Sequence, residues 1–160
     1  MKKCVFAGTF DPPTIGHKHI IDTCLELFDE VVVAIGVNTA KSPLLTVEER
    51  KGLIEKLYEC EKRVKCVTYD GATVDLLEME NTRYYVRGVR NTVDFEYENA
   101  NLFASKKLKK DIVTLYIPAE QENLHISSSL VRNSYRFKKE FSDYIPEKIL
   151  PDLLKILNSK

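Results

Sequence analysis

The stretch GTFDPPTIGH, residues 8–17, decides how the first part of the chain folds. It follows a short apolar run at Cys4–Ala7 and precedes His17–Phe28, in which apolar side chains recur at helical spacing. Gly8 permits a sharp turn at the end of a strand, and the two prolines at 12 and 13 exclude helix from the loop. The sequence therefore predicts a strand, a stiff loop and a helix in direct succession.

His17 falls in the first turn of that predicted helix, beside backbone N–H groups that have no partner within the helix. These groups and the positive end of the helix dipole favour an anion, and an imidazole there can donate a hydrogen bond to a phosphate oxygen. A histidine in this place could also cap the helix or face water. We interpret the loop as a phosphate site because other donor groups are predicted to lie close to it.

The same alternation of short apolar runs and helical patterns continues to the end of the chain. The further predicted strands are Val31–Val37, Val64–Thr68, Tyr84–Arg87 and Ile112–Ile117. The second helix is predicted to begin at a capping box, Thr46-Val-Glu-Glu49. Three further helices are predicted at Val74–Glu80, Val93–Leu108 and Ser128–Phe137. Strand followed by helix, five times, predicts an α/β fold: a single Rossmann-like, doubly wound domain with a five-stranded parallel sheet and helices on both faces. We expect residues 1–160 to form this one domain, with a helical tail at about 141–160 docked on it.

Composition narrows the class of protein. The 160 residues carry a formal net charge of zero, which argues against a general nucleic-acid binder. No stretch of about 18 apolar residues predicts a membrane span, and no signal-peptide pattern follows the N-terminus. The four cysteines have no CxxC spacing, so we expect reduced thiols. The sequence thus predicts a cytoplasmic protein without a nucleic-acid or membrane partner.

Charged and hydroxyl side chains follow the other predicted strands, and parallel strands present their carboxyl ends at one edge of a sheet. Lys41 follows the second strand and can act as a point charge for phosphate. Arg87 and Arg90 flank a glycine after the fourth, where guanidinium forks can bind phosphate oxygens. Asp94 and Glu98 then enter a helix, either as ligand contacts or as favourable charge in its first turn. Three serines, Ser127–Ser129, open a later helix; one is enough for a cap, so the triplet favours a ligand.

Two widespread phosphate motifs do not occur. The sequence has no GxxxxGK[ST], which excludes a P-loop, and no GxGxxG after the first strand, which disfavours a nicotinamide or flavin cofactor.

Taken together, these motifs resemble the phosphopantetheine adenylyltransferases of the nucleotidylyltransferase superfamily. Thr14-Ile-Gly-His17 is similar to the TxGH signature of the superfamily. The more specific segments are GTFDP (8–12), KSP (41–43), TxEER (46–50), RGxR with DFEYE (87–98) and ISSSLVR (126–132), which match the family in order and spacing. The resemblance covers essentially the whole chain.

The resemblance implies an enzyme that transfers the adenylyl group of MgATP to 4′-phosphopantetheine, with Mg²⁺ as the cofactor and a homohexamer as the assembly. His17, Lys41 and Arg90 would be catalytic, His17 by stabilising the transition state at the α-phosphate. The implied ATP contacts are Thr9, Phe10, His17, Gly88, Val89, Arg90, Glu98, Asn123, Leu124, His125, Ile126, Ser127, Ser128 and Ser129. The implied contacts to the second substrate are Thr9, Lys41, Thr73 and Arg87. It implies no dedicated metal ligand.

The cationic groups occur without an evident Ser–His–acid or Cys–His pair, which favours direct attack of one substrate on the other. Three alternatives are open at this point. The first loop alone suits another adenylyl- or cytidylyltransferase, for example one acting on nicotinamide mononucleotide, and the RGxR and DFEYE segments argue against it. A nucleotide-binding module without catalysis would bind ATP and release no diphosphate. A domain like those of class I tRNA synthetases shares an IGH element, but the chain has no lysine loop resembling KMSKS.

Overall fold

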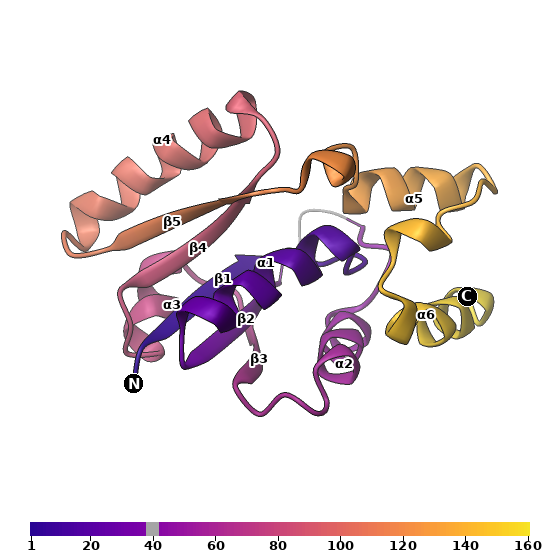
Figure 1. The fold of residues 1–160 in the computed structure, drawn as a ribbon, viewed down its shortest axis with the longest axis horizontal. Helices are drawn as coiled ribbons and strands as arrows, with labels where there is room; N and C mark the ends of the chain where they lie inside the picture. The colour runs from indigo at the N-terminus through magenta and orange to yellow at the C-terminus, as the bar shows by residue number, and fades with distance from the viewer. Residues whose placement is uncertain (38–41) are drawn as a thin grey trace.

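The structure, a computed structural model, describes residues 1–37 and 42–160. Its centre is one parallel sheet with the strand order β3-β2-β1-β4-β5 (Figure 1). The strands are β1 (Lys3–Gly8), β2 (Glu30–Gly36), β3 (Val64–Tyr69), β4 (Tyr84–Val89) and β5 (Val113–Pro118). The predicted five-stranded, doubly wound α/β fold is confirmed, with strand ends within two residues of those expected.

Six α-helices and three short 3₁₀ turns connect and follow these strands in the described ranges. The helices are α1 (Ile15–Leu27), α2 (Val47–Leu57), α3 (Thr73–Met79), α4 (Thr92–Leu108), α5 (Ser128–Arg136) and α6 (Leu150–Asn158). The 3₁₀ turns are η1 (Gln121–Asn123), η2 (Ser142–Tyr144) and η3 (Glu147–Ile149). The predicted capping box of α2 forms as expected: Thr46 Oγ1 accepts from the Glu49 amide at 3.1 Å, and Glu49 Oε2 accepts from the Thr46 amide at 2.8 Å.

Both faces of the sheet are covered, because alternate side chains of the buried strands point to opposite sides. Phe6 belongs to a cluster with Ile21 and Cys24 of α1, whereas Val5 belongs to a separate cluster with Leu77 of α3. The strand β2 is buried on both sides, as its unbroken apolar sequence predicts. None of the helices in residues 1–37 and 42–160 combines the length and apolar character that crossing a bilayer requires.

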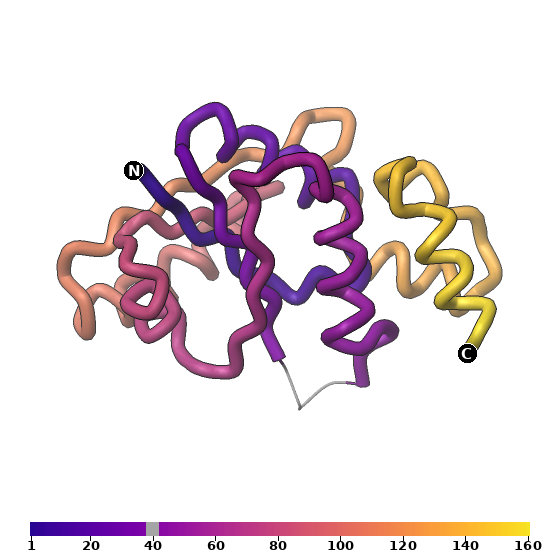
Figure 2. The backbone as a smooth tube through the Cα atoms, turned by 90° about the horizontal axis from the view of Figure 1, so that it is seen from below, coloured from indigo at the N-terminus to yellow at the C-terminus, as the bar shows by residue number. Residues whose placement is uncertain are grey.

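The C-terminal segment packs against two neighbouring helices and not against the sheet. Leu153 and Leu157 of α6 join a third buried cluster with Leu53 of α2 and Val131 of α5. Figure 2 shows α6, in yellow, beside α2 and at the opposite end of the molecule from the N-terminus. Side chains of α6 therefore pack with those of α2 and α5.

The sheet opens between β1 and β4, where the order of strands reverses. Their ladder reaches only to the pair Phe6 and Val86, although β1 continues to Gly8 and β4 to Val89. By contrast, the β1–β2 ladder continues to Gly8 and Ile35. Such a switch point at the carboxyl ends of parallel strands is where doubly wound folds bind ligands.

Candidate active site

A cleft of about 650 Å³ lies at this switch point. It is lined by side chains from the first loop, the end of β4, the start of α4 and the segment that leads into α5. Thirteen of the site residues expected from the sequence line it: Thr9, Phe10, His17, Arg87, Gly88, Val89, Arg90, Glu98, Asn123, Ile126, Ser127, Ser128 and Ser129. Segments that are distant in the sequence thus contribute to one cavity.

Four expected residues have a different place. Leu124 and His125 do not line the cleft; both are exposed, and the His125 ring lies edge-on to Tyr144 at 5.7 Å. Thr73 is the first residue of α3, beyond β3, and is also not part of the cleft wall. Lys41 lies outside the described residues, next to Ser42, which lines the cleft.

His17 is held by the residue that begins its own helix. Thr14, the N-cap of α1, donates its backbone N–H to Nδ1 of His17 at 3.0 Å, and its hydroxyl lies 3.1 Å from the same nitrogen. A neutral imidazole that accepts at Nδ1 carries its proton on Nε2. The ring packs beside Phe10, with 4.8 Å between the ring centroids. His17 therefore presents one N–H donor, at Nε2, in a fixed orientation.

The environment keeps this imidazole neutral. Burial and, to a smaller extent, the positive charges of Arg90 and Arg87 together lower the pKa of His17 to about 4. His17 is consequently a hydrogen-bond donor at neutral pH and not a proton-carrying cation.

Arg87 is more buried than Arg90. Its Nη1 donates to the carbonyl of Ala7 at 2.8 Å and to the Tyr85 hydroxyl at 3.2 Å, and its Nη2 forms an ion pair with Glu98 of α4. Its Nε is buried and has no hydrogen-bond partner among the described residues. The pair joins the end of β4 to α4, so Arg87 and Glu98 meet each other in the ligand-free protein.

Arg90 is held more loosely. Its guanidinium pairs with Asp94, four residues later, with 2.9 Å between Nε and Oδ2, and 40% of its side chain is exposed. Such an exposed pair is weak and can exchange for another anion. Gly88, between the two arginines, serves packing first: a Cβ at this position would collide with Ile20 Cδ1 of α1.

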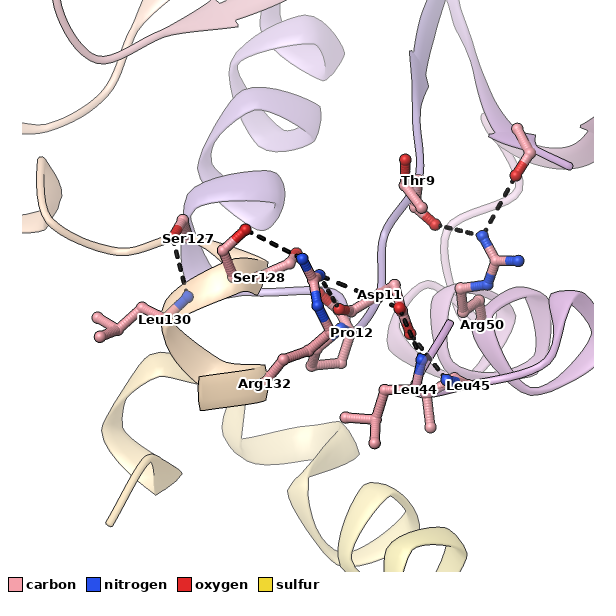
Figure 3. Close-up of polar contacts among 12 residues, drawn as sticks. Thr9, Asp11, Pro12, Leu44, Leu45, Arg50, Ser127, Ser128, Leu130 and Arg132 are labelled. Atoms are coloured by element: carbon pink, nitrogen blue, oxygen red, sulfur yellow. Dashed lines mark hydrogen bonds and ion pairs between the residues drawn. The ribbon is translucent and has the colours of Figure 1, made fainter. Parts of the chain in front are cut away.

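The three serines at the start of α5 have three different partners, and Figure 3 labels two of them, Ser127 and Ser128. Ser127 is the N-cap, since its Oγ accepts from the Leu130 amide at 3.1 Å. Ser128 Oγ donates to the carbonyl of Pro12 at 2.8 Å, and Ser129 Oγ accepts from Arg132 at 3.0 Å. One serine thus caps the helix, and the other two connect to the cleft wall.

Three buried or half-buried charges in the cleft wall had no role predicted for them. Asp11 accepts the amides of Leu44 and Leu45 at 2.9 and 2.8 Å. Arg132 donates to the carbonyl of Asp11 at 2.7 Å, and Arg50 donates to carbonyls on β2 and the first loop. These residues occur in the quoted motifs GTFDP, ISSSLVR and TxEER, but their partners are remote in sequence.

Comparison with known proteins assigns the chain to a family. A family model described as cytidylyltransferase-like matches residues 5–134. A phosphopantetheine adenylyltransferase from Flavobacterium johnsoniae is 40% identical over 149 residues, which cover 93% of this chain and 97% of the relative. The chain belongs to the phosphopantetheine adenylyltransferase family. Family members from Bacteroides thetaiotaomicron (37% identical; 92% of this chain, 97% of the relative) and Helicobacter pylori (36%; 95% and 97%) agree with this assignment.

Membership confirms the resemblance expected from the sequence and the enzyme class, a nucleotidyltransferase. A solved structure of a proposed nicotinate-nucleotide adenylyltransferase from Vibrio parahaemolyticus superimposes with a TM-score of 0.70 and covers 96% of this chain and 99% of its own. At 22% identity, this likeness concerns the fold alone.

Proposed function

We propose that this chain transfers the adenylyl group of ATP to 4′-phosphopantetheine, with dephospho-coenzyme A and diphosphate as products of a step in coenzyme A biosynthesis. The family supports this proposal, and one observation carries it: His17 offers a fixed, neutral donor in a cleft that Arg87 and Arg90 also line. Phosphoryl chemistry needs positioning and charge stabilisation more than it needs reactive groups from the protein.

Direct transfer fits the partners of His17. The one hydroxyl that contacts the imidazole within the described ranges is that of Thr14, which is 2% exposed and lies against Nδ1, the nitrogen opposite the protonated Nε2. The acceptor phosphate is itself an anionic nucleophile and needs no base. One of its oxygens would bond to the α-phosphorus of ATP while the bond from that phosphorus to the bridging oxygen breaks and diphosphate leaves. Nε2 of His17 would donate to the α-phosphate as charge develops there.

In this proposal Arg90 binds ATP and Arg87 binds the acceptor. Arg90, exposed and weakly paired with Asp94, would exchange its partner for phosphate oxygens of ATP. Arg87 and Lys41 would hold the phosphate of the acceptor. The backbone from Gly88 to Arg90 and the segment 123–129 would contact the nucleotide. Leu124, His125 and Thr73 enter with less support, because they do not line the cleft.

Magnesium would enter bound to ATP. No group of three or more His, Cys, Asp or Glu side chains with the spacing of a metal site occurs in residues 1–37 and 42–160. The acidic side chains of the cleft are engaged, Glu98 with Arg87 and Asp94 with Arg90. This suits Mg²⁺, which is commonly held by substrate phosphates and water. The ion would supply neutralisation of phosphate charge.

An acceptor panel tests the function. The protein is incubated with MgATP and 4′-phosphopantetheine, nicotinamide mononucleotide or no acceptor, and diphosphate release is followed. We expect diphosphate release from MgATP only when phosphopantetheine is the acceptor. Release with nicotinamide mononucleotide at a comparable rate would favour the alternative transferase, and ATP binding with no release under any acceptor would favour a nucleotide-binding module.

We also propose a homohexamer in the cytoplasm. The helix α4 has no buried side chain, and Val93, Tyr97, Phe103 and Leu108 are each more than 60% exposed. A helix with so much exposed apolar surface is typical of an interface. Light scattering would give about six times the 18.4 kDa of one chain if this is right, and one chain mass if it is not.

A further inference from the structure

Arg50 is an unusual residue in the wall of the cleft. It lies in the first turn of α2, its side chain is 2% exposed, and it contacts no carboxylate within the described ranges. All three of its hydrogen bonds go to backbone carbonyls: Nε donates to Thr46 at 3.2 Å, and Nη1 donates to Thr9 at 2.8 Å and to Gly36 at 3.2 Å. Burying a charged guanidinium costs free energy, and no contacting carboxylate among the described residues offsets that cost. The placement of Arg50 against these carbonyls therefore needs an explanation.

The bond to Thr9 acts on the peptide that joins Thr9 to Phe10 (Figure 3). Because the peptide unit is planar and trans, its carbonyl and its N–H point in opposite directions. When Arg50 holds the carbonyl of Thr9, the N–H of Phe10 is therefore directed away from Arg50. That N–H has no hydrogen-bond partner in the part of the chain that the structure describes, and both residues line the cleft.

The conformation of Phe10 needs such support. Its φ is 53°, in the left-handed region that residues other than glycine rarely adopt. Strained backbone of this kind persists where surrounding contacts fix it. One such contact is between the rings of Phe10 and Phe6, whose centroids are 5.3 Å apart. The bond from Arg50 to the carbonyl of Thr9 is another. The positive charge of Arg50, beside that carbonyl, also polarises the peptide and makes its N–H a stronger donor.

We propose that Arg50 is a positioning residue that turns the Thr9–Phe10 peptide so that the Phe10 N–H donates to a phosphate oxygen of the nucleotide. This rests on the proposed function, since it takes ATP as the ligand. Arg50 does not touch the substrate; it acts through the backbone of the first loop. The helix α2, with its capping box, gives it a rigid base.

The test is an NMR measurement on one peptide. Thr9–Phe10 is the only Thr-Phe pair in the sequence, so labelling threonine carbonyl carbon with ¹³C and phenylalanine nitrogen with ¹⁵N selects a single amide signal. In the native protein, MgATP without an acceptor should shift this signal downfield. In R50Q the shift should be largely lost, and R50K, which keeps the charge on a shorter side chain, should recover part of it.

Kinetics supplies the second readout. We expect R50Q to lower kcat by about 100-fold, the scale of a 1 Å misplacement, with a much smaller change in KM for ATP. R63Q is the matched control, because Arg63 also donates to a remote carbonyl, that of Leu25 at 2.9 Å, but lies outside the cleft. It should leave both the amide shift and kcat as in the native protein.

The outcomes separate the two proposals. Calorimetry of the native protein shows first whether MgATP binds at all, and failure there contradicts the proposed function. If ATP binds, and folded R50Q keeps the full ATP-induced shift of the Phe10 amide with native kcat, the role of Arg50 is wrong. An equal loss of kcat and rise of KM with an unchanged amide shift would also overturn it.

Discussion

The backbone N–H of Thr14 donates to Nδ1 of His17 over 3.0 Å, and this bond decides which nitrogen of the neutral imidazole carries the proton. The proton is confined to Nε2, and burial keeps the ring neutral at physiological pH. Thr14 and His17 are the first and last residues of the TIGH motif. The motif thus contains both the donor and the group that orients it.

His17→Ala should lower turnover by about 10²–10³-fold, because it removes one preorganised donor at a phosphate that gains charge. The free energy of unfolding should change little by comparison. Steady-state kinetics with MgATP and phosphopantetheine measures the effect. His19→Ala is the control: His19 lies on the same helix, pairs with Glu120 at 3.7 Å and does not line the cleft. Near-native turnover in His17→Ala would show that the role assigned to His17 is wrong.

The pH dependence of stability should carry the signature of His17. Its pKa is about 4 in the folded protein and about 6.5 in the unfolded chain. Between these values the unfolded chain binds a proton that the folded protein does not, so lowering the pH favours unfolding. The contribution of His17 is fully present above about pH 6.5 and is lost progressively toward pH 4.

Thermal unfolding at pH 7.5 and pH 5 measures this effect. We expect the native protein to lose more Tm between the two than His17→Gln, and kcat to show no inflection near pH 6.5. Equal losses of Tm in the two proteins would mean that His17 titrates normally.

Glu98→Gln should lower the free energy of unfolding by about 2 kcal/mol, because it leaves the half-buried guanidinium of Arg87 without its charged partner. Urea denaturation gives the value. Glu55→Gln is the matched control, since the pair of Glu55 with Lys51 is exposed and such pairs contribute about 0.3–0.5 kcal/mol. Equal effects of the two substitutions would contradict the structural role of the Arg87–Glu98 pair.

Ser127 and Ser129, at the start of α5, should differ in how much each contributes to the free energy of unfolding. Ser127→Ala removes the N-cap bond to Leu130 and should cost about 1 kcal/mol of stability. Ser129→Ala, in the same turn, removes only a bond from a half-exposed arginine and should cost less than about 0.5 kcal/mol. Urea denaturation of both variants decides this, and the reverse order would show that the cap is assigned to the wrong residue.

The docked C-terminal helix offers a pair of adjacent leucines. Leu153 is fully buried against α2 and α5, and Leu153→Ala should cost about 2–5 kcal/mol. Leu154 is 38% exposed, and Leu154→Ala should cost well under half as much. Thermal or urea unfolding measures both; a small effect of Leu153→Ala would mean that α6 is not docked as described.

What the sequence predicts well is local. The turn after β1, the capping box at Thr46 and the buried strand β2 each follow from residues within a few positions of one another. The doubly wound sheet follows too, since parallel strands joined by helices have few alternatives. The loops that meet at the switch point then place His17, Arg87 and Arg90 in one cleft.

What the sequence could not supply is the partner of each charge. Asp11 meets the amide of Leu45, 34 residues away; Arg50 meets Thr9, 41 residues away; and Arg132 meets Asp11, 121 residues away. No periodicity in the sequence indicates such contacts, because they arise where loops from different strands meet. The pairing of Arg87 with Glu98, 11 residues apart, was hidden for a different reason, since both could equally face a ligand.

A single-turnover measurement with ATP labelled at the α-phosphate tests the central claim most directly. The protein is mixed with labelled MgATP, with and without 4′-phosphopantetheine, quenched at short times, and the label is located. Direct transfer predicts that the label passes from ATP to dephospho-coenzyme A, only when the acceptor is present, with none on the protein. Label on the protein in the absence of acceptor would contradict the account.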